Sequence, residues 1–213
     1  MSESEILFQD ERLVAVSKPA GRPTIPGRGE IGEAVSAELA RRLGARVFVV
    51  HRLDREASGV LVFAKDAAAH RELCARFEER LAGKTYLAAV AGRLEGEGIV
   101  DLPLKDFGSG RVGPSPQGKA SRTRWRVERA WREATLLRVS PETGRRHQIR
   151  AHLCALGRPI LGDPRYGPAP RPVGGAPRLM LHALSLAVEA GGRRYELEAR
   201  PGADFQAVLA AFA

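Results

Sequence analysis

Short runs of alternating or continuous apolar residues, a pattern typical of β-strands, dominate the chain. They predict strands at residues 6–9, 12–17, 47–50, 59–64, 85–90, 121–127, 132–139, 179–188 and 193–199. The run 121–127 alternates clearly, because Arg122, Arg124 and Arg126 occupy one face and Ser, Thr, Trp and Val occupy the other. Several runs are joined by hairpin-length links, which favours antiparallel pairing.

Helical periodicity lies between these strands and predicts four helices, at residues 30–43, 66–81, 147–156 and 204–212. Gly44 is a stop signal for the first helix. Asp66 can cap the second helix, which we expect to run to Leu81 with Gly83 as its stop signal. Residues 18–23, Lys-Pro-Ala-Gly-Arg-Pro, predict a rigid turn, and the Gly/Pro-rich residues 162–177 predict a surface loop.

The 213 residues suffice for one substantial domain, and neither an internal repeat nor a clear linker is visible. Strands outnumber helices and often follow one another through hairpins, which favours an α+β protein over a doubly wound one. We therefore expect a single domain over residues 1–213, built on a mixed, mainly antiparallel β-sheet with flanking helices.

The net charge of +9 is concentrated in one region of the chain. Residues 110–178 contain 15 basic and 4 acidic residues, whereas the rest of the chain contains 19 and 21. A regional basic excess is expected of a surface that meets a polyanion, and a solvated basic face is the alternative. The sequence contains no apolar run of 18 residues, so no transmembrane helix is predicted. The acidic N-terminus shows no signal-peptide core.

The stretch His-Arg-Leu-Asp-Arg-Glu at residues 51–56 separates two apolar strands. A short loop between strands is a good place to hold one side chain in a cleft. The carboxylate of Asp54, which lies between Arg52 and Arg55, is expected to stay ionised. An ionised carboxylate can act as a nucleophile, a base or a charge stabiliser at a sugar carbon. A surface ion pair is the alternative interpretation.

Residues 141–152, Pro-Glu-Thr-Gly-Arg-Arg-His-Gln-Ile-Arg-Ala-His, are typical of a loop that enters a short helix. A helix N-terminus favours anions such as phosphate. If this helix starts near Arg146, then Arg146 and Arg150 share one face, and Arg150 can point toward a carboxylate. Gln148 and His152 share a face by the same i, i+4 spacing.

Tyr86 opens the predicted strand 85–90, where its ring can lie flat against a nucleobase. A core tyrosine with a satisfied hydroxyl is the alternative. His147 and His152 lie five positions apart, which does not match the i, i+4 spacing of helical metal ligands. We therefore expect no metal site.

Five motifs follow one another along the chain: HRLDREASG, GKTYLAAVAG, ETGRRHQIRAHL, GRPILGDPRYG and RLMLHALSL. Together with the opening ILFQDERLVAVSKPAGRPTIPG, they resemble the RluA-type family of RNA pseudouridine synthases. The resemblance implies one catalytic domain with a central RNA-binding cleft, no separate N-terminal RNA-binding domain, no cofactor and no metal. One departure is Ala57, where the family usually has Thr.

The resemblance also implies roles for individual residues. Asp54 matches the catalytic aspartate, Tyr86 the tyrosine that stacks on the target uracil, and Arg150 the arginine that pairs with the aspartate. Arg52 matches the arginine that helps displace the target base and hold the RNA, and Leu181 is expected near the base. RNA-backbone contacts are expected from Arg145, Arg146, His147, Arg122, Arg124 and Arg126.

The implied reaction isomerises specific uridines to pseudouridine in structured RNA, either transfer RNA or ribosomal RNA. Attack of Asp54 on C1′, attack on C6 and a glycal route all stay open. The resemblance implies neither DNA nor a membrane as partner, and we expect a cytoplasmic monomer. Two other functions stay open: an RNA-binding protein that has lost catalysis, and a hydrolase with a carboxylate pair that releases free uracil.

Overall fold

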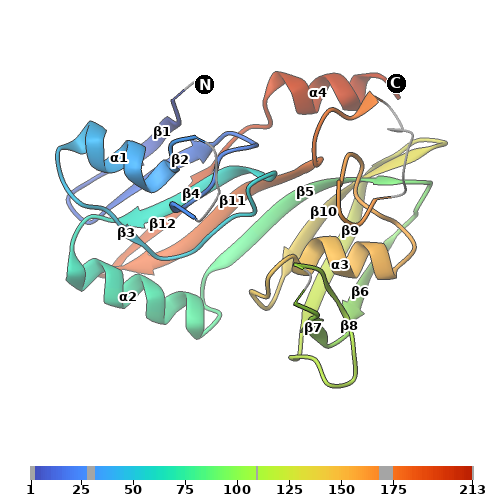
Figure 1. Ribbon diagram of the computed structural model, residues 1–213, viewed down its shortest axis with the longest axis horizontal. Coiled ribbons are helices and arrows are strands. Elements are labelled where there is room, and N and C mark those ends of the chain that lie inside the picture. Colours follow the sequence, from blue (N-terminus) through green and yellow to red (C-terminus); the bar gives the residue numbers. More distant parts are fainter. Residues whose placement is uncertain (1–2, 28–31, 109, 168–174, 213) are drawn as a thin grey trace. The chain divides into compact units, whose positions relative to one another are not determined.

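Figure 1 shows the computed structural model of the chain, which describes residues 3–27, 32–108, 110–167 and 175–212. The chain forms two compact units. The first unit combines residues 1–84 with residues 183–200, and the second combines residues 85–182 with residues 201–213. Within the described residues, no helix is long and apolar enough to cross a membrane.

The first unit is a small antiparallel sheet with two helices. Its strands follow the order β1-β2-β4-β11, with β3 paired to β4 and β12 paired to β11. The bounds of its elements are β1 (Glu5–Gln9), β2 (Leu13–Lys18), α1 (Val35–Leu43), β3 (Phe48–Val49), β4 (Ser58–Ala64), α2 (Ala67–Glu78), β11 (Leu181–Ala190, which belongs to this unit from Ala183 onward) and β12 (Arg193–Glu198).

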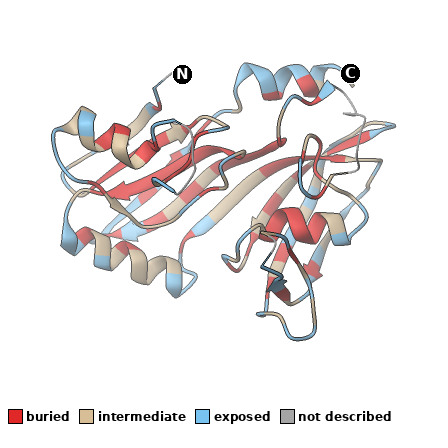
Figure 2. Cartoon of the chain, viewed as in Figure 1, coloured by how far each residue is buried: buried red, intermediate tan, exposed pale blue. Residues whose placement is uncertain are grey.

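The core of the first unit lies against β4, in which every residue is buried (Figure 2). Helix α2 contributes Ala69 and Leu73 to this core, where they join Val62 of β4 and Leu186 of β11. An amphipathic helix and a continuously apolar strand stabilise each other by removing this area from water, at about 25 cal/mol per Å². The strand is therefore a rigid support for the loop that precedes it.

The second unit holds the strands β5, β10, β9 and β6, paired in that order, and a two-stranded sheet of β7 and β8. Its elements are β5 (Gly83–Ala91), β6 (Glu97–Asp101), β7 (Leu104–Asp106), β8 (Val112–Pro114), β9 (Arg122–Ala130), β10 (Ala134–Pro141), α3 (Gln148–Ala155) and α4 (Ala203–Ala210). Helix α3 packs on β8 through Ala151, which joins Leu104, Val112 and Tyr166 in one buried cluster.

The predicted α+β class and the mainly antiparallel sheet are confirmed, since every pairing with a described register is antiparallel. The predicted strands are present with shifts of a few residues at their ends, whereas β6, β7 and β8 were not predicted. The prediction of one domain over residues 1–213, without a separate N-terminal RNA-binding domain, stays a prediction.

The predicted helix signals are confirmed in part. Asp66 accepts hydrogen bonds from the backbone N–H groups of Ala68 and Ala69, as an N-cap does. Gly44 ends α1 in the left-handed conformation. The predicted end of α2 at Leu81 is wrong, because Arg80 takes the left-handed conformation (φ 62°) and Gly83 opens β5 instead.

Candidate active site

Asp54 lies in the loop between β3 and β4, inside the first unit. Its carbonyl oxygen accepts a hydrogen bond from the N–H of Ala57, 3.1 Å away, so the loop closes as a tight turn. Leu53 and Ala57 are buried and anchor the turn on both sides, while Asp54 itself is half-buried. The flanking Arg52 is exposed. The loop therefore holds one carboxylate at a partly open position.

The turn at residues 18–24 fixes the backbone on both sides of Asp54. The buried Lys18 ammonium donates to the carbonyl oxygen of Arg55 at 2.9 Å, and the N–H of Gly21 donates to the same oxygen at 2.8 Å. On the other side, the Thr24 hydroxyl donates to the carbonyl of Leu53 and accepts from its N–H. The residues before and after Asp54 are therefore both tied to one rigid turn.

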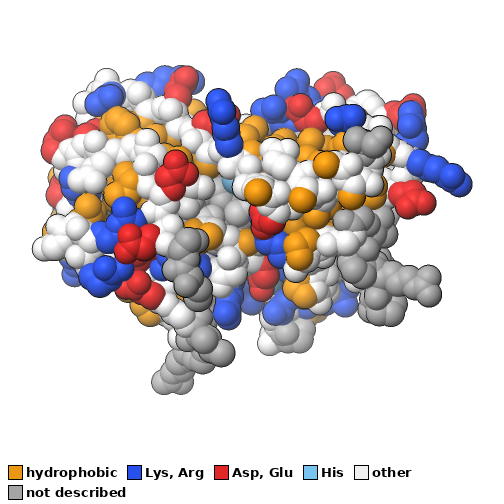
Figure 3. Space-filling model, turned by 90° about the horizontal axis from the view of Figure 1, so that it is seen from above, with side chains coloured by type: hydrophobic (Ala, Val, Ile, Leu, Met, Phe, Trp, Pro, Cys, Tyr) orange, Lys and Arg blue, Asp and Glu red, His pale blue; other side chains and the backbone are white. Residues whose placement is uncertain are grey.

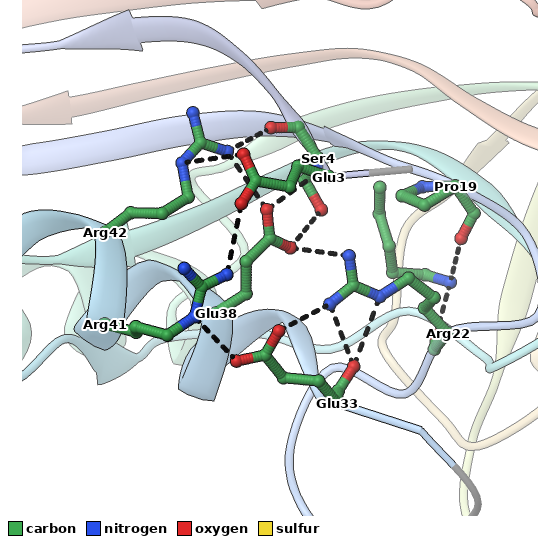
Figure 4. A network of polar contacts seen from close by, with 9 residues as sticks. Glu3, Ser4, Pro19, Arg22, Glu33, Glu38, Arg41 and Arg42 are labelled. Atoms are coloured by element: carbon green, nitrogen blue, oxygen red, sulfur yellow. Dashed lines mark hydrogen bonds and ion pairs between the residues drawn. The ribbon is translucent and has the colours of Figure 1, made fainter. Parts of the chain in front are cut away.

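A buried ion-pair network supports this turn (Figure 4). Glu38 of α1 accepts hydrogen bonds from the backbone N–H and the hydroxyl of Ser4, and from Arg22 and Arg42. Burial alone raises the pKa of Glu38, but these hydrogen bonds together lower it below the usual value. Arg22 also donates to the carbonyl oxygen of Glu33 through Nε and Nη2. The network ties α1 and the start of the chain to the turn.

His51 anchors the first residue of the loop. Its ring stacks on Phe77 of α2 with 4.6 Å between ring centroids, and its Nε2 accepts the N–H of Val62 at 3.1 Å. Burial and the nearby Lys84 lower the pKa of His51 to about 3. The imidazole is therefore neutral at physiological pH, which Nε2 requires in order to accept a hydrogen bond.

Gly59 lets β4 approach β11 closely at the end of the loop. Its φ is +113°, and a Cβ atom there would lie 2.1 Å from the carbonyl oxygen of Ala183. No side chain fits at that distance, so glycine is required by the space as well as by the conformation. The loop thus ends at a fixed point on the neighbouring strand.

Tyr86, Leu181 and Arg150 are the predicted site residues of the second unit. Tyr86 is half-buried in β5 opposite Val139 of β10, and Leu181 is buried at the first residue of β11. Because Asp54 belongs to the other unit, the meeting of these side chains with Asp54 stays a prediction. The predicted RNA-binding cleft stays a prediction for the same reason.

Arg150 is buried in α3 and forms an ion pair that sequence reasoning missed. Its Nε and Nη2 donate to the two carboxylate oxygens of Asp163, each at 2.8 Å. Burial alone raises the pKa of Asp163, but the hydrogen bonds and the charge of Arg150 lower it below the usual value. The expected surface loop at residues 162–177 is wrong at Asp163 and Tyr166, which are buried, and residues 168–174 lie outside the described chain.

Helix α3 begins at Gln148, so Arg146 lies before it and the conditional prediction that Arg146 and Arg150 share a helical face does not apply. The shared face of Gln148 and His152 is confirmed, because both side chains contact the hydroxyl of Thr123. His147 occupies the N-cap position with a left-handed φ of 51°.

The predicted RNA-binding residues of the second unit are mostly ion-paired on the surface. Arg122 and Arg124 contact Glu142, Arg126 contacts Glu128, and Arg146 contacts Asp106. The other two make neutral contacts, Arg145 with the carbonyl of Ala120 and His147 with the hydroxyl of Tyr166. Figure 3 shows basic and acidic side chains next to one another on the face that it displays. Exposed pairs of this kind are worth about 0–1 kcal/mol, so a phosphate can replace the carboxylate.

The described residues contain no group of three or more His, Cys, Asp or Glu side chains placed to hold a metal ion. What the first unit does offer is the carboxylate of Asp54 on a loop whose backbone is held by a turn, a network and a strand. This arrangement suits a carboxylate that acts on a bound substrate, because a fixed backbone limits the positions that its side chain can take.

Comparison with known proteins identifies the family of this chain. A family model described as RNA pseudouridylate synthase matches residues 12–155, which include both Asp54 and Arg150. The chain therefore belongs to the RNA pseudouridylate synthase family. The dual-specificity RNA pseudouridine synthase RluA of Salmonella typhimurium is 41% identical over 188 residues, covering 86% of this chain and 85% of that protein. The resemblance to the RluA-type family is confirmed.

Two relatives with the name ribosomal large subunit pseudouridine synthase are longer than this chain. Synthase D of Nitrosomonas europaea is 40% identical over 195 residues, and synthase C of Vibrio cholerae is 40% identical over 188 residues. Each match covers 85% of this chain but only 57% and 60% of the two relatives. The chain thus spans less than two thirds of their length.

Solved structures show the same fold. Human RNA pseudouridylate synthase domain containing 4 has a TM-score of 0.82 at 27% identity, covering 98% of this chain and 92% of that one. Human RNA pseudouridylate synthase domain containing 1 has a TM-score of 0.79 at 26% identity, covering 93% and 84%.

Proposed function

We propose that this protein isomerises specific uridines in structured RNA to pseudouridine, with Asp54 as the catalytic carboxylate. The observation that carries the proposal is the fixed backbone on both sides of Asp54, at Leu53 and Arg55, within the segment that matches the RNA pseudouridylate synthase family. A carboxylate held in this way can act at the sugar or the base of a bound nucleotide.

The other predicted residues supply the remaining parts of the reaction. The target base must leave its stack before its glycosidic bond can be reached, and Arg52 is the residue that helps displace it. Tyr86 provides a ring on which the extruded uracil stacks, at about 1–3 kcal/mol per base, and Leu181 lines the apolar side. Arg150 is the third catalytic residue of the proposal. The reaction has no net redox or hydrolytic step and needs no cofactor.

The RNA backbone is held by the surface side chains Arg122, Arg124, Arg126, Arg145, Arg146 and His147. The regional basic excess of residues 110–178 supports this part of the proposal. The substrate is transfer RNA or ribosomal RNA, two classes consistent with the names of the relatives. We place the protein in the cytoplasm as a monomer. Mapping of pseudouridine at single-nucleotide resolution in cells with and without the gene identifies the RNA and the position.

The decisive experiment measures release of tritium from RNA labelled at C5 of uridine. Asp54→Asn should release no tritium above background while it still binds RNA, and the matched control Glu56→Gln, two residues away on the same loop, should keep turnover. Wild-type turnover in Asp54→Asn refutes the assignment. Free uracil as product favours the hydrolase, and RNA binding by the wild type without any modified product favours the protein that has lost catalysis.

A further inference from the structure

The segment Gly-Asp-Pro-Arg-Tyr-Gly at residues 162–167 folds as a cradle around the guanidinium of Arg150. Asp163 accepts two hydrogen bonds of 2.8 Å from one edge of the guanidinium. Its side chain is 0% exposed, and that of Arg150 is 1% exposed. Tyr166 lies on the flat side, with 5.2 Å between the Arg150 Cζ and the ring centroid. Two kinds of contact therefore fix both the direction and the plane of this guanidinium.

The cradle is itself rigid. The Oδ1 atom of Asp163 accepts the backbone N–H groups of Arg165 and Tyr166 at 2.9 and 3.1 Å, which locks the carboxylate in one rotamer. The Tyr166 hydroxyl accepts the N–H of Val112 at 2.8 Å, so the ring cannot swing away from Arg150. These bonds tie the cradle to β8, an element on which α3 also packs.

Both glycines of the segment are required by close backbone contacts. At Gly162, where φ is +67°, a Cβ atom would lie 1.9 Å from the carbonyl oxygen of Arg178. At Gly167, a Cβ atom would lie 2.5 Å from the carbonyl oxygen of Asp163. A side chain at either position would clash with backbone and displace the segment. Both glycines therefore help to fix the position of residues 162–167.

From this geometry we infer that Asp163 is a positioning residue for catalysis and acts through Arg150. The bonds to Asp163 use the Nε–Nη2 edge of the guanidinium, and a guanidinium has a second edge, Nη1–Nη2, that can hold another carboxylate in the same plane. The inference rests on the proposed function, in which Arg150 is a catalytic residue. Asp163 then sets the direction in which the guanidinium of Arg150 points.

The test is a double-mutant cycle with steady-state kinetics on the RNA substrate. In the wild-type background, Asp163→Asn should lower kcat by about 10–100-fold while KM changes by less than about threefold, because misplacement of an aiming group affects the chemical step. In the Arg150→Lys background, which has no bidentate fork, Asp163→Asn should lower kcat by less than about threefold. Equal losses in the two backgrounds would show that Asp163 acts independently of Arg150 and overturn the inference.

Asp204→Asn is the control, because Asp204 accepts from Nε and Nη2 of Arg178 in the same bidentate way, although its side chain is 48% exposed. It should leave kcat unchanged. If Asp163→Asn does not fold, Asp163→Glu decides, since it keeps the buried charge and shifts it by one methylene. A soluble Asp163→Glu enzyme with at least about a tenfold lower kcat supports the inference, and wild-type kcat overturns it. A wild-type protein that forms no pseudouridine refutes the proposed function instead.

Discussion

Arg22 and Glu38 form a buried ion pair with 2.6 Å between Nη1 and Oε2, and their side chains are 5% and 0% exposed. The pair supports the loop that carries Asp54 from a distance along the chain. Their effect passes through the turn, because Arg22 belongs to the segment whose Lys18 and Gly21 hold the carbonyl of Arg55. The loop geometry thus depends on a carboxylate in a different element.

We expect Glu38→Gln to lower the free energy of unfolding by about 3 kcal/mol or more, because it leaves the buried Arg22 cation without its charged partner. The matched control is Glu33→Gln, since Glu33 is 43% exposed and its carboxylate is 4.0 Å from Arg22. That change should cost less than about 1 kcal/mol. Urea unfolding of both variants provides the measurement, and equal losses would contradict the expectation.

Gly59→Ala should destabilise the protein by more than about 3 kcal/mol, because the added Cβ atom meets backbone that cannot move without breaking β4 or β11. Gly21→Ala is the control, since Gly21 also has a positive φ, +83°, but no atom lies within 4 Å of its added Cβ. The cost there should be about 1 kcal/mol, the conformational term alone. Thermal and urea unfolding separate the two cases, and similar losses would contradict the steric argument.

His51 should make the fold sensitive to acid. Its pKa is about 3 in the folded protein and near 6.5 in the unfolded chain, so the unfolded chain binds more protons between these values. The stabilising contribution is present above pH 6.5 and is lost as the pH falls toward 3, by up to about 1.4 kcal/mol per pH unit.

The variant His51→Gln isolates this effect, because Gln keeps an acceptor for the N–H of Val62 and does not titrate. The free energy of unfolding of the variant, measured from pH 7 to pH 4, should fall less steeply than that of the wild type. Parallel pH profiles for the two proteins would show that His51 does not carry the effect.

RNA binding by Arg122, Arg124 and Arg126 of β9 should depend on the carboxylates that these arginines contact. Glu142→Gln removes the charge that Arg122 and Arg124 both contact, so we expect tighter RNA binding at low salt. Arg124→Ala should weaken binding and reduce the slope of log K against log salt by about 0.7–0.9. Arg93 also forms an exposed ion pair, with Glu95, but lies outside β9. Arg93→Ala should therefore leave the slope of log K against log salt unchanged. An unchanged slope in Arg124→Ala places the RNA elsewhere.

Features with local causes could be predicted from the sequence. Asp66 caps a helix through N–H groups two and three residues away, and Gly44 ends one through its own conformation. The alternation of residues 121–127 likewise follows from the two faces of a single strand. Each of these signals can be read without knowing the rest of the fold.

The residues that were missed act over longer distances. Glu38 is 16 positions from Arg22 and Asp163 is 13 positions from Arg150, and a carboxylate pattern gives no sign of burial. The end of α2 near Arg80 cannot be predicted from the sequence, because a non-glycine residue rarely adopts a left-handed φ. Glycine is the usual stop signal, which favours Gly83. The loop that carries Asp54 stands out because several motifs occur in order along the chain, not because of its own composition.

The core behind the Asp54 loop joins two stretches of chain that leave the ribosome at very different times. Val62 is synthesised early, whereas Leu186 and Leu197, which complete the same cluster, come late. Contacts between such distant segments form only after long loops close. A nascent chain that has already released Asp54 but not yet Arg200 therefore lacks the part of this core that Leu186 and Leu197 supply. We expect such partial chains to leave RNA unmodified until the residues through Arg200 have been synthesised.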